Sequence, residues 1–304
     1  MKLLEGIKIL DISTRLPGPL AGKILRDLGA EVIKIEDKNK RDPFAMPLGN
    51  TKDLTFNRWY KNINQDKNII FLDYKSPKDQ SEIKKLIQRV DGIILSLPPH
   101  LQDILGLSQN QIEKLDQQIA VVSLSAQKES ENAMHDLNAL AETQILNIYT
   151  NQIDKKIINP PFLPIAGITY GNKIATDLIA AILKTKNINT PIYYHSDLLS
   201  STQEILGTLF KGQTESSFLH NGKYPCYSIY QTKDKKFIAL AAIEEKYWSE
   251  FSNCFGLHLN SEDRFNYSEK IFTIISKKIS SYTQDEIITK TKSSNFCLSI
   301  ISDK

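Results

Sequence analysis

The sequence predicts an α/β protein whose larger part contains a parallel sheet. Two short apolar runs are typical of buried strands, and their residues are Ile7, Ile9, Leu10 and Ile12, followed by Val32, Ile33 and Ile35. The apolar residues between these runs recur at helical spacing and are Leu20, Ile24, Leu25 and Leu28. Gly29 can then close this helix in a left-handed conformation. Two strands joined by one helix within about 30 residues form a βαβ unit, whose strands run parallel.

The turn after the first strand is a candidate ligand site. The Pro17–Pro19 segment stops the strand, and Gly18 within it lets the backbone turn sharply. Open parallel sheets bind ligands at the carboxyl ends of their strands, which is where Arg15 and Leu16 are expected. A dinucleotide cofactor needs a G-x-G-x-x-G turn, whereas this turn carries only Gly18 and Gly22. We therefore expect neither a nicotinamide nor a flavin cofactor.

The length and composition indicate a globular protein of two domains. We expect a large domain over 1–215 and a small α+β domain over 216–304, with a linker at the polar stretch 212–217. The apolar fraction is 41%, and no apolar run approaches the roughly 20 residues that cross a bilayer. The N-terminus has no signal-peptide core. We therefore expect a cytoplasmic protein that does not bind membranes.

Charge and cysteine content disfavour two further classes of function. The formal net charge is +3, and the lysines alternate with Asp and Glu, so we expect no nucleic-acid surface. Cys226, Cys254 and Cys297 are far apart, which gives neither a disulfide framework nor a metal site. A reducing compartment fits this pattern.

The remaining elements follow from the same apolar patterns. The expected strands are at 66–75, 90–95 and 120–124, and the expected helices are at 77–89, 175–184 and about 196–211. Residues 41–64 are irregular and polar, and we interpret Trp59 and Tyr60 there as packing residues. A hairpin and then a helix are expected between Asn221 and Trp248.

The first 43 residues also resemble a known family. The Pro-Gly-Pro turn, the stretch Asp27–Glu36 and the stretch Lys40–Pro43 have the order and spacing of the class III CoA-transferases of the CaiB/BaiF type. The motifs are most similar to those of α-methylacyl-CoA racemase. This resemblance extends over nearly the whole chain. It implies a Rossmann-like, CoA-binding large domain, CoA or acyl-CoA as substrate, no metal, and a homodimer.

The resemblance also implies which residues contact CoA. They are Arg15, Leu16, Pro17, Lys40, Lys67 and Lys75. The last two lie in a segment that resembles the family's N-K-R-S-I-x-L-D-L-K. Asn68 stands where that segment usually has an arginine, and an asparagine cannot bind phosphate bidentately.

Four positions are candidates for the chemistry. Ala133–Leu140 resembles the family's G-H-D-L-N-Y-L, in which the histidine is an acid/base of the racemases, so His135 and Asp136 are implied. Gly167 occupies the position of the family's aspartate, which is the nucleophile of the transferases and one of two bases in the racemases. Glu244 occupies the position of a glutamate at the racemase active site, although an acid at a helix N-terminus also explains it.

Two hypotheses for the function stay open. One is an acyl-CoA enzyme of this family with altered catalysis, because His135 and Glu244 can still move a proton on one side of the α-carbon. The other is a degenerate member that binds CoA or a partner without catalysis. The departures at Gly167, at the glycine-free loop 125–132 and at the arginine positions favour altered or lost chemistry. The chain also stops at Lys304, and we expect it to lack the family's return segment, which interlocks two subunits.

Overall fold

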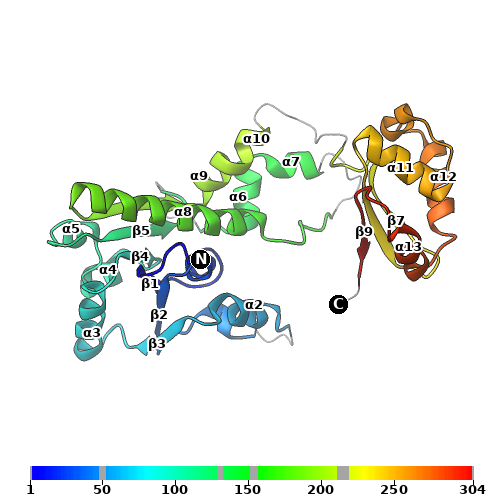
Figure 1. The fold of residues 1–304 in the computed structure, drawn as a ribbon. Coiled ribbons are helices and arrows are strands. Elements are labelled where there is room, and N and C mark those ends of the chain that lie inside the picture. The colour runs from blue at the N-terminus through cyan, green and yellow to red at the C-terminus, as the bar shows by residue number, and fades with distance from the viewer. Residues whose placement is uncertain (1, 48–52, 129–132, 151–156, 211–218, 303–304) are drawn as a thin grey trace. The chain divides into compact units, whose positions relative to one another are not determined.

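The computed structural model of the chain describes residues 2–47, 53–128, 133–150, 157–210 and 219–302. The chain divides into two compact units, Met1–Gln213 and Thr214–Lys304 (Figure 1). The predicted linker 212–217 lies outside the described residues, as does the 129–132 part of the glycine-free loop.

The first unit is built on a six-stranded sheet in the order β3-β2-β1-β4-β5-β6, and each pair of neighbouring strands is parallel. Its strands are β1 (Lys8–Ile12), β2 (Glu31–Asp37), β3 (Asn68–Leu72), β4 (Gly92–Leu95), β5 (Ala120–Ser125) and β6 (Ile192–Asp197). Lys8 pairs with Glu31 and Asp11 with Lys34, so the predicted parallel strands of the first 36 residues are confirmed. The strand order reverses between β1 and β4.

Helices connect these strands. They are α1 (Pro17–Asp27), α2 (Thr55–Asn64), α3 (Pro77–Ile87), α4 (Pro99–Leu105), α5 (Gln109–Ile112), α6 (Asp136–Glu142), α7 (Ile145–Thr150), α8 (Ile165–Ile188), α9 (Leu198–Thr202) and α10 (Thr208–Phe210). A short 3-10 helix, η1 (Pro43–Ala45), follows β2, and a π-helical turn, η2 (Gln203–Gly207), joins α9 to α10.

Apolar clusters bury both faces of the sheet. On one face Ile9 belongs to a cluster with Leu25 of α1 and Leu178 of α8. On the other face the next residue, Leu10, belongs to a cluster with Ile83 of α3. Because both faces are covered, the central strands β1, β4 and β5 carry mainly apolar residues, as is typical of parallel sheets in α/β proteins. The predicted α/β class is therefore confirmed.

The prediction of irregular chain over 41–64 is wrong, because its last ten residues form α2. Phe56, Trp59, Tyr60 and Ile63 have the i, i+3, i+4, i+7 spacing of a helix, but polar residues between them conceal the pattern. Contacts among the aromatic side chains of α2 and η1 stabilise this helix against the rest of the unit.

Helix α8 is also longer than predicted, since it begins at Ile165 instead of Ala175. Pro164 comes directly before its first turn. The early start places Gly167 and Gly171 inside the helix, on the side that packs against α1. The predicted helix near 196–211 begins at Leu198, because β6 continues to Asp197.

The second unit contains an antiparallel sheet in the order β7-β8-β9. Its elements are β7 (Tyr227–Gln231), β8 (Phe237–Ala241), α11 (Glu245–Phe255), the 3-10 helix η3 (Ser261–Phe265), α12 (Glu269–Ile279), α13 (Gln284–Thr291) and β9 (Leu298–Ile301). The predicted hairpin is β7–β8. Trp248, Phe251 and Ile275 are fully buried in the core of this unit. No helix in the described part of the chain is both long and apolar enough to cross a bilayer.

Candidate functional site

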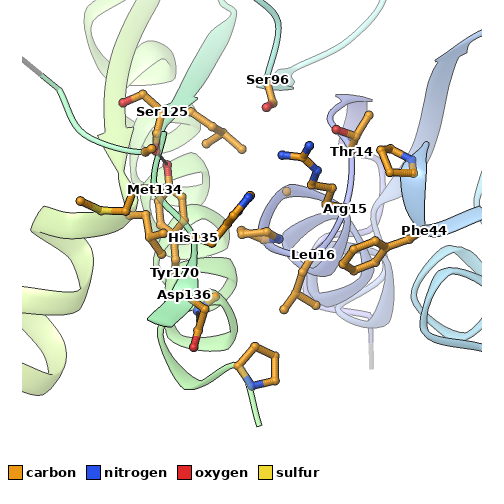
Figure 2. A pocket seen from close by; sticks show the side chains of 18 of the residues that line it. Thr14, Arg15, Leu16, Phe44, Ser96, Ser125, Met134, His135, Asp136 and Tyr170 are labelled. Atoms are coloured by element: carbon orange, nitrogen blue, oxygen red, sulfur yellow. Dashed lines mark hydrogen bonds between the residues drawn. The ribbon is translucent and has the colours of Figure 1, made fainter. Parts of the chain in front are cut away.

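A cavity of about 760 Å³ opens in the first unit at the carboxyl ends of three strands (Figure 2). Arg15 lines it just after β1, Ser96 just after β4, and Ser125 at the end of β5. Because the strand order reverses between β1 and β4, this is the crevice where open parallel sheets bind ligands. The volume is within the range of small-molecule sites.

The turn that carries Arg15 has an unusual backbone. The φ angle of Arg15 is 67°, in the left-handed region, which costs a non-glycine residue about 1 kcal/mol. The backbone N–H of Arg15 donates to both carboxylate oxygens of buried Asp42, at 3.1 and 3.0 Å. Asp42 also accepts from the N–H of Phe44, at 2.9 Å. Asp42 therefore holds the strained turn in place.

The buried side chains of Lys67 and Asp11 stabilise the turn that follows β1. The Lys67 ammonium donates to Asp11 at 2.9 Å, to the carbonyl of Pro19 at 2.7 Å and to the side chain of Asn64 at 2.9 Å. Burial opposes the ionisation of Asp11, but the positive charges of Lys34 and Lys67 outweigh it and hold the pKa of Asp11 below its usual value. All three donors of Lys67 are used inside the protein. We therefore expect Lys67 to support the turn instead of contacting CoA.

Two of the candidate residues stand where helix α6 begins. His135 precedes the helix, is exposed and lines the cavity, and its backbone N–H donates to the side-chain oxygen of Asn138 at 3.1 Å. Asp136 accepts the backbone N–H of Gly167 at 2.7 Å. Burial raises the pKa of Asp136 above its usual value, although the N–H groups of Gly167 and Ala166 favour the ionised form. The fold thus brings His135, Asp136 and Gly167 to one cavity wall.

Gly167 leaves room beside this carboxylate. A Cβ atom built on Gly167 would lie 3.1 Å from Cδ2 of Leu16 and 3.7 Å from Oδ1 of Asp136. The point from which an aspartate side chain would start at position 167 is therefore next to an existing carboxylate. The site keeps an acidic group although residue 167 has none.

We expect alanine at positions 171 and 167 to have different effects on stability. A Cβ on Gly171 would lie 3.1 Å from the backbone oxygen of Pro17 and 2.9 Å from Leu20, so Gly171→Ala should lower the free energy of unfolding by about 1–3 kcal/mol. Gly167→Ala should change it by less than about 1 kcal/mol, because the end of the Leu16 side chain can move and alanine favours a helix. Urea unfolding measures both. Equal effects would contradict the close approach of α1 and α8.

One wall of the cavity is aromatic, which the sequence pattern does not predict. The rings of Phe44 and Phe56 stack with centroids 4.4 Å apart, and Trp59 meets Phe56 edge to face at 5.4 Å. All three residues line the cavity, together with apolar residues from other elements. The sequence pattern predicts only a packing role for Trp59. The helical spacing of Phe56 and Trp59, with Phe44 near the end of β2, was the available signal.

Only some of the other predicted residues line the cavity. Leu16 and Pro17 line the cavity, whereas Lys40 and Lys75 are exposed and do not line it. Glu244 belongs to the second unit, where it directly precedes α11 and its carbonyl accepts the N–H of Trp248 at 3.0 Å. In the part of the chain that the structure describes, no group of three or more His, Cys, Asp or Glu side chains could hold a metal ion.

The fold and the cavity together define an α/β protein of the doubly wound type with a small-molecule site at the sheet's switch point. The imidazole of His135 and the carboxylate of Asp136 belong to residues that line one wall of this site. The sequence model of CoA-transferase family III matches residues 4–303, and the chain belongs to this family.

Comparison with known proteins agrees with this assignment. The chain is 23% identical to a CaiB/baiF CoA-transferase family protein of Caenorhabditis elegans, over 99% of this chain and 86% of that one. It is 27% identical to the succinyl-CoA:glutarate CoA-transferase of Mus musculus, over 77% of this chain but only 55% of that one. It is 23% identical to the human alpha-methylacyl-CoA racemase, over 86% of this chain and 66% of that one.

A solved structure shows the same fold. The crystal structure of a CaiB/BaiF family protein from Brucella suis superimposes with a TM-score of 0.77 at 16% identity, over 99% of this chain and 84% of that one. The resemblance seen in the sequence is therefore confirmed at the level of family and fold.

Proposed function

We propose that this protein binds an acyl-CoA thioester with its acyl group in the cavity of the first unit, and that His135 exchanges a proton with the acyl α-carbon. The observation that carries the proposal is the meeting of His135, Asp136 and Gly167 at one wall of the cavity. The apolar and aromatic lining suits an acyl chain. The family supplies the substrate class, since its members are CoA-transferases and racemases.

The chemistry follows from the thioester. Its carbonyl makes the α-hydrogen acidic, so the His135 imidazole takes that proton and the C–H electron pair forms an enolate. Asp136 lines the same cavity, and burial raises the pKa of its carboxyl group above the usual value. The imidazolium then returns a proton to the same carbon. In D₂O the returned atom is deuterium, so exchange is visible without any net reaction.

A second candidate is a member that binds CoA thioesters without acting on them. Gly167 favours it, because glycine supplies neither the nucleophile of a transferase nor the second base of a racemase. The two functions share their ligand and differ in what happens at the α-carbon. Lys40 and Lys75 are proposed to contact the CoA phosphates in either case, and Glu244 is proposed to keep the active-site role that the resemblance implies.

The test measures binding and exchange separately. Free CoA and 2-methylbutyryl-CoA are expected to raise the melting temperature, since a ligand at about 100 times its Kd stabilises the folded state by about 2.7 kcal/mol. Mass spectrometry of 2-methylbutyryl-CoA incubated with the protein in D₂O is expected to show one added deuterium. Binding without exchange would support the second candidate, and no stabilisation by either ligand would overturn both.

Two further proposals concern the protein's state. We infer that it acts as a homodimer, as the resemblance implies, and that it resides in the cytoplasm, because its three cysteines are too far apart in sequence to indicate a disulfide framework. Light scattering of the purified chain decides the first, and fractionation of the source cells decides the second.

A further inference from the structure

A buried ion pair lies behind the turn that follows β1. The side chains of Lys34 and Asp42 are both fully buried, and the Lys34 ammonium lies 3.8 Å from the Asp42 carboxylate. The ammonium donates to the carbonyl of Ser13 at 2.6 Å. Both oxygens of the carboxylate accept the N–H of Arg15, at 3.1 and 3.0 Å. The pair therefore holds the backbone on both sides of Thr14, which lines the cavity.

The same carboxylate also holds one end of the aromatic wall. Asp42 accepts the N–H of Phe44 at 2.9 Å and caps the helix η1. Phe44 stacks on Phe56 of α2, and both residues line the cavity. Figure 2 shows Arg15 and Phe44 together on the side of the cavity opposite His135. One buried carboxylate thus joins the two segments that form this side.

A gain in stability does not by itself explain this pair. Burying two charges is unfavourable, and a buried ion pair repays it only where the two groups are close and well hydrogen-bonded. At 3.8 Å the Lys34 ammonium is outside hydrogen-bond distance of Asp42, and two apolar residues of similar volume are often as stable. What the pair does hold is the turn at Arg15, whose φ of 67° persists only where the surrounding structure fixes it. Such strained turns are typical of ligand sites.

We propose that Lys34 and Asp42 are positioning residues, which set the turn after β1 against the aromatic wall and so shape the cavity before an acyl-CoA binds. This inference rests on the proposed binding of an acyl-CoA in the cavity. Neither residue lines the cavity, so both act through the backbone groups that they hold. Without the pair, the turn and the wall populate other arrangements. The affinity then falls in proportion to the fraction of molecules in which the cavity has its binding shape.

Replacing Asp42 by asparagine tests the carboxylate with little change of volume. In either orientation of the amide, its NH2 group faces the N–H of Arg15, because both oxygens of Asp42 accept from that group. Two donors in contact loosen the turn, and calorimetry with 2-methylbutyryl-CoA should give a Kd about tenfold above the wild-type value. The stoichiometry should stay the same. A residue that only stabilises the fold has the opposite signature, since unfolded protein lowers the stoichiometry and leaves the Kd of the folded fraction unchanged.

Two further measurements do not depend on that variant. Lys34→Met removes the other end of the pair and should also raise the Kd with an unchanged stoichiometry. In the wild-type protein without ligand, hydrogen exchange at the backbone N–H groups of Arg15 and Phe44 should already be slow, because Asp42 holds both. Fast exchange there, slowed only by the ligand, would mean that the turn forms on binding and would overturn the inference.

Asp177→Asn is the matched control. Asp177 of α8 accepts the Lys173 ammonium at 2.6 Å, lies in the same unit and does not line the cavity. This variant should lose stability and keep the wild-type Kd. An unchanged Kd in Asp42→Asn that is folded by its melting curve, or an equal rise in Asp177→Asn, would overturn the inference and leave the proposed function intact. If the wild-type protein binds neither free CoA nor 2-methylbutyryl-CoA, the proposed function fails and this inference fails with it.

Discussion

Replacing His135 by alanine is expected to slow the exchange of the acyl α-hydrogen by about 10²–10⁴-fold. In terms of the activation barrier this is roughly 3–5 kcal/mol. The reason is positional: the exposed imidazole lies on the cavity wall that also carries Asp136 and Gly167. The backbone of His135 starts α6 through its bond to Asn138, and alanine keeps that backbone bond. The variant should therefore fold and bind acyl-CoA with nearly the wild-type Kd.

His195→Ala serves as the control for this variant. His195 lies on β6 in the same unit, is exposed, and contacts the side chain of Gln109 at 3.2 Å instead of the cavity. The His195→Ala variant should exchange the acyl α-hydrogen at the wild-type rate, as followed by mass spectrometry in D₂O. Wild-type exchange by His135→Ala would assign the proton transfer to another group.

Replacing Lys67 by methionine is expected to lower the free energy of unfolding by about 3–5 kcal/mol. The side chains of Lys67 and Asp11 are both fully buried and 2.9 Å apart, so the substitution leaves a buried carboxylate without its nearest positive charge. Methionine keeps much of the volume, which separates the loss of charge from the loss of packing. Urea unfolding at neutral pH measures the effect. The control is Lys23→Met, which removes an exposed pair with Asp27 on α1 and should cost less than about 1 kcal/mol.

The same pair predicts how stability depends on pH. The pKa of Asp11 is lowered in the folded protein, so its ionised form contributes stability above its unfolded pKa of about 3.9. This contribution is lost as the pH falls below that value and through the folded pKa. In Lys67→Met the pKa of Asp11 rises towards or above the unfolded value, so this acid-dependent loss should shrink. An unchanged pH profile in the variant would show that Lys34 alone stabilises the carboxylate.

Much of the first unit could be predicted because its signals are local. The apolar runs of β1 and β2 and the turn residues around α1 predict a βαβ unit from within one stretch of chain. The sequence does not predict helix α2, because polar residues separate its aromatic side chains. The helical spacing of these side chains becomes evident only from their packing against Phe44. The start of α8 was missed because Gly167 and Gly171 weaken a helix by themselves, and the close approach of α1 is what favours them.

In the candidate site, too, some features follow from local sequence and others depend on packing between distant segments. His135 and Asp136 were found by their motif, and Arg15 by its place after the first strand. The resemblance implies a phosphate contact for Lys67, whereas two of its three acceptors, Asp11 and Pro19, come from distant segments of the chain. Lys34 was an available signal of this network, since a lysine within an apolar strand needs a buried partner.

The amino-acid sequence by itself determined the parallel sheet, the family and the residue at position 167, because each depends on neighbours along the chain. Only the tertiary structure decided that the carboxylate of Asp136 lies beside Gly167 and that the Arg15 side chain lines the cavity without an ion pair among the described residues. The physical reason is that hydrogen bonds and burial join groups far apart in sequence. The hydrogen bonds that the backbone N–H groups of Gly167 and Arg15 donate to Asp136 and Asp42 form only when the strands and helices have packed.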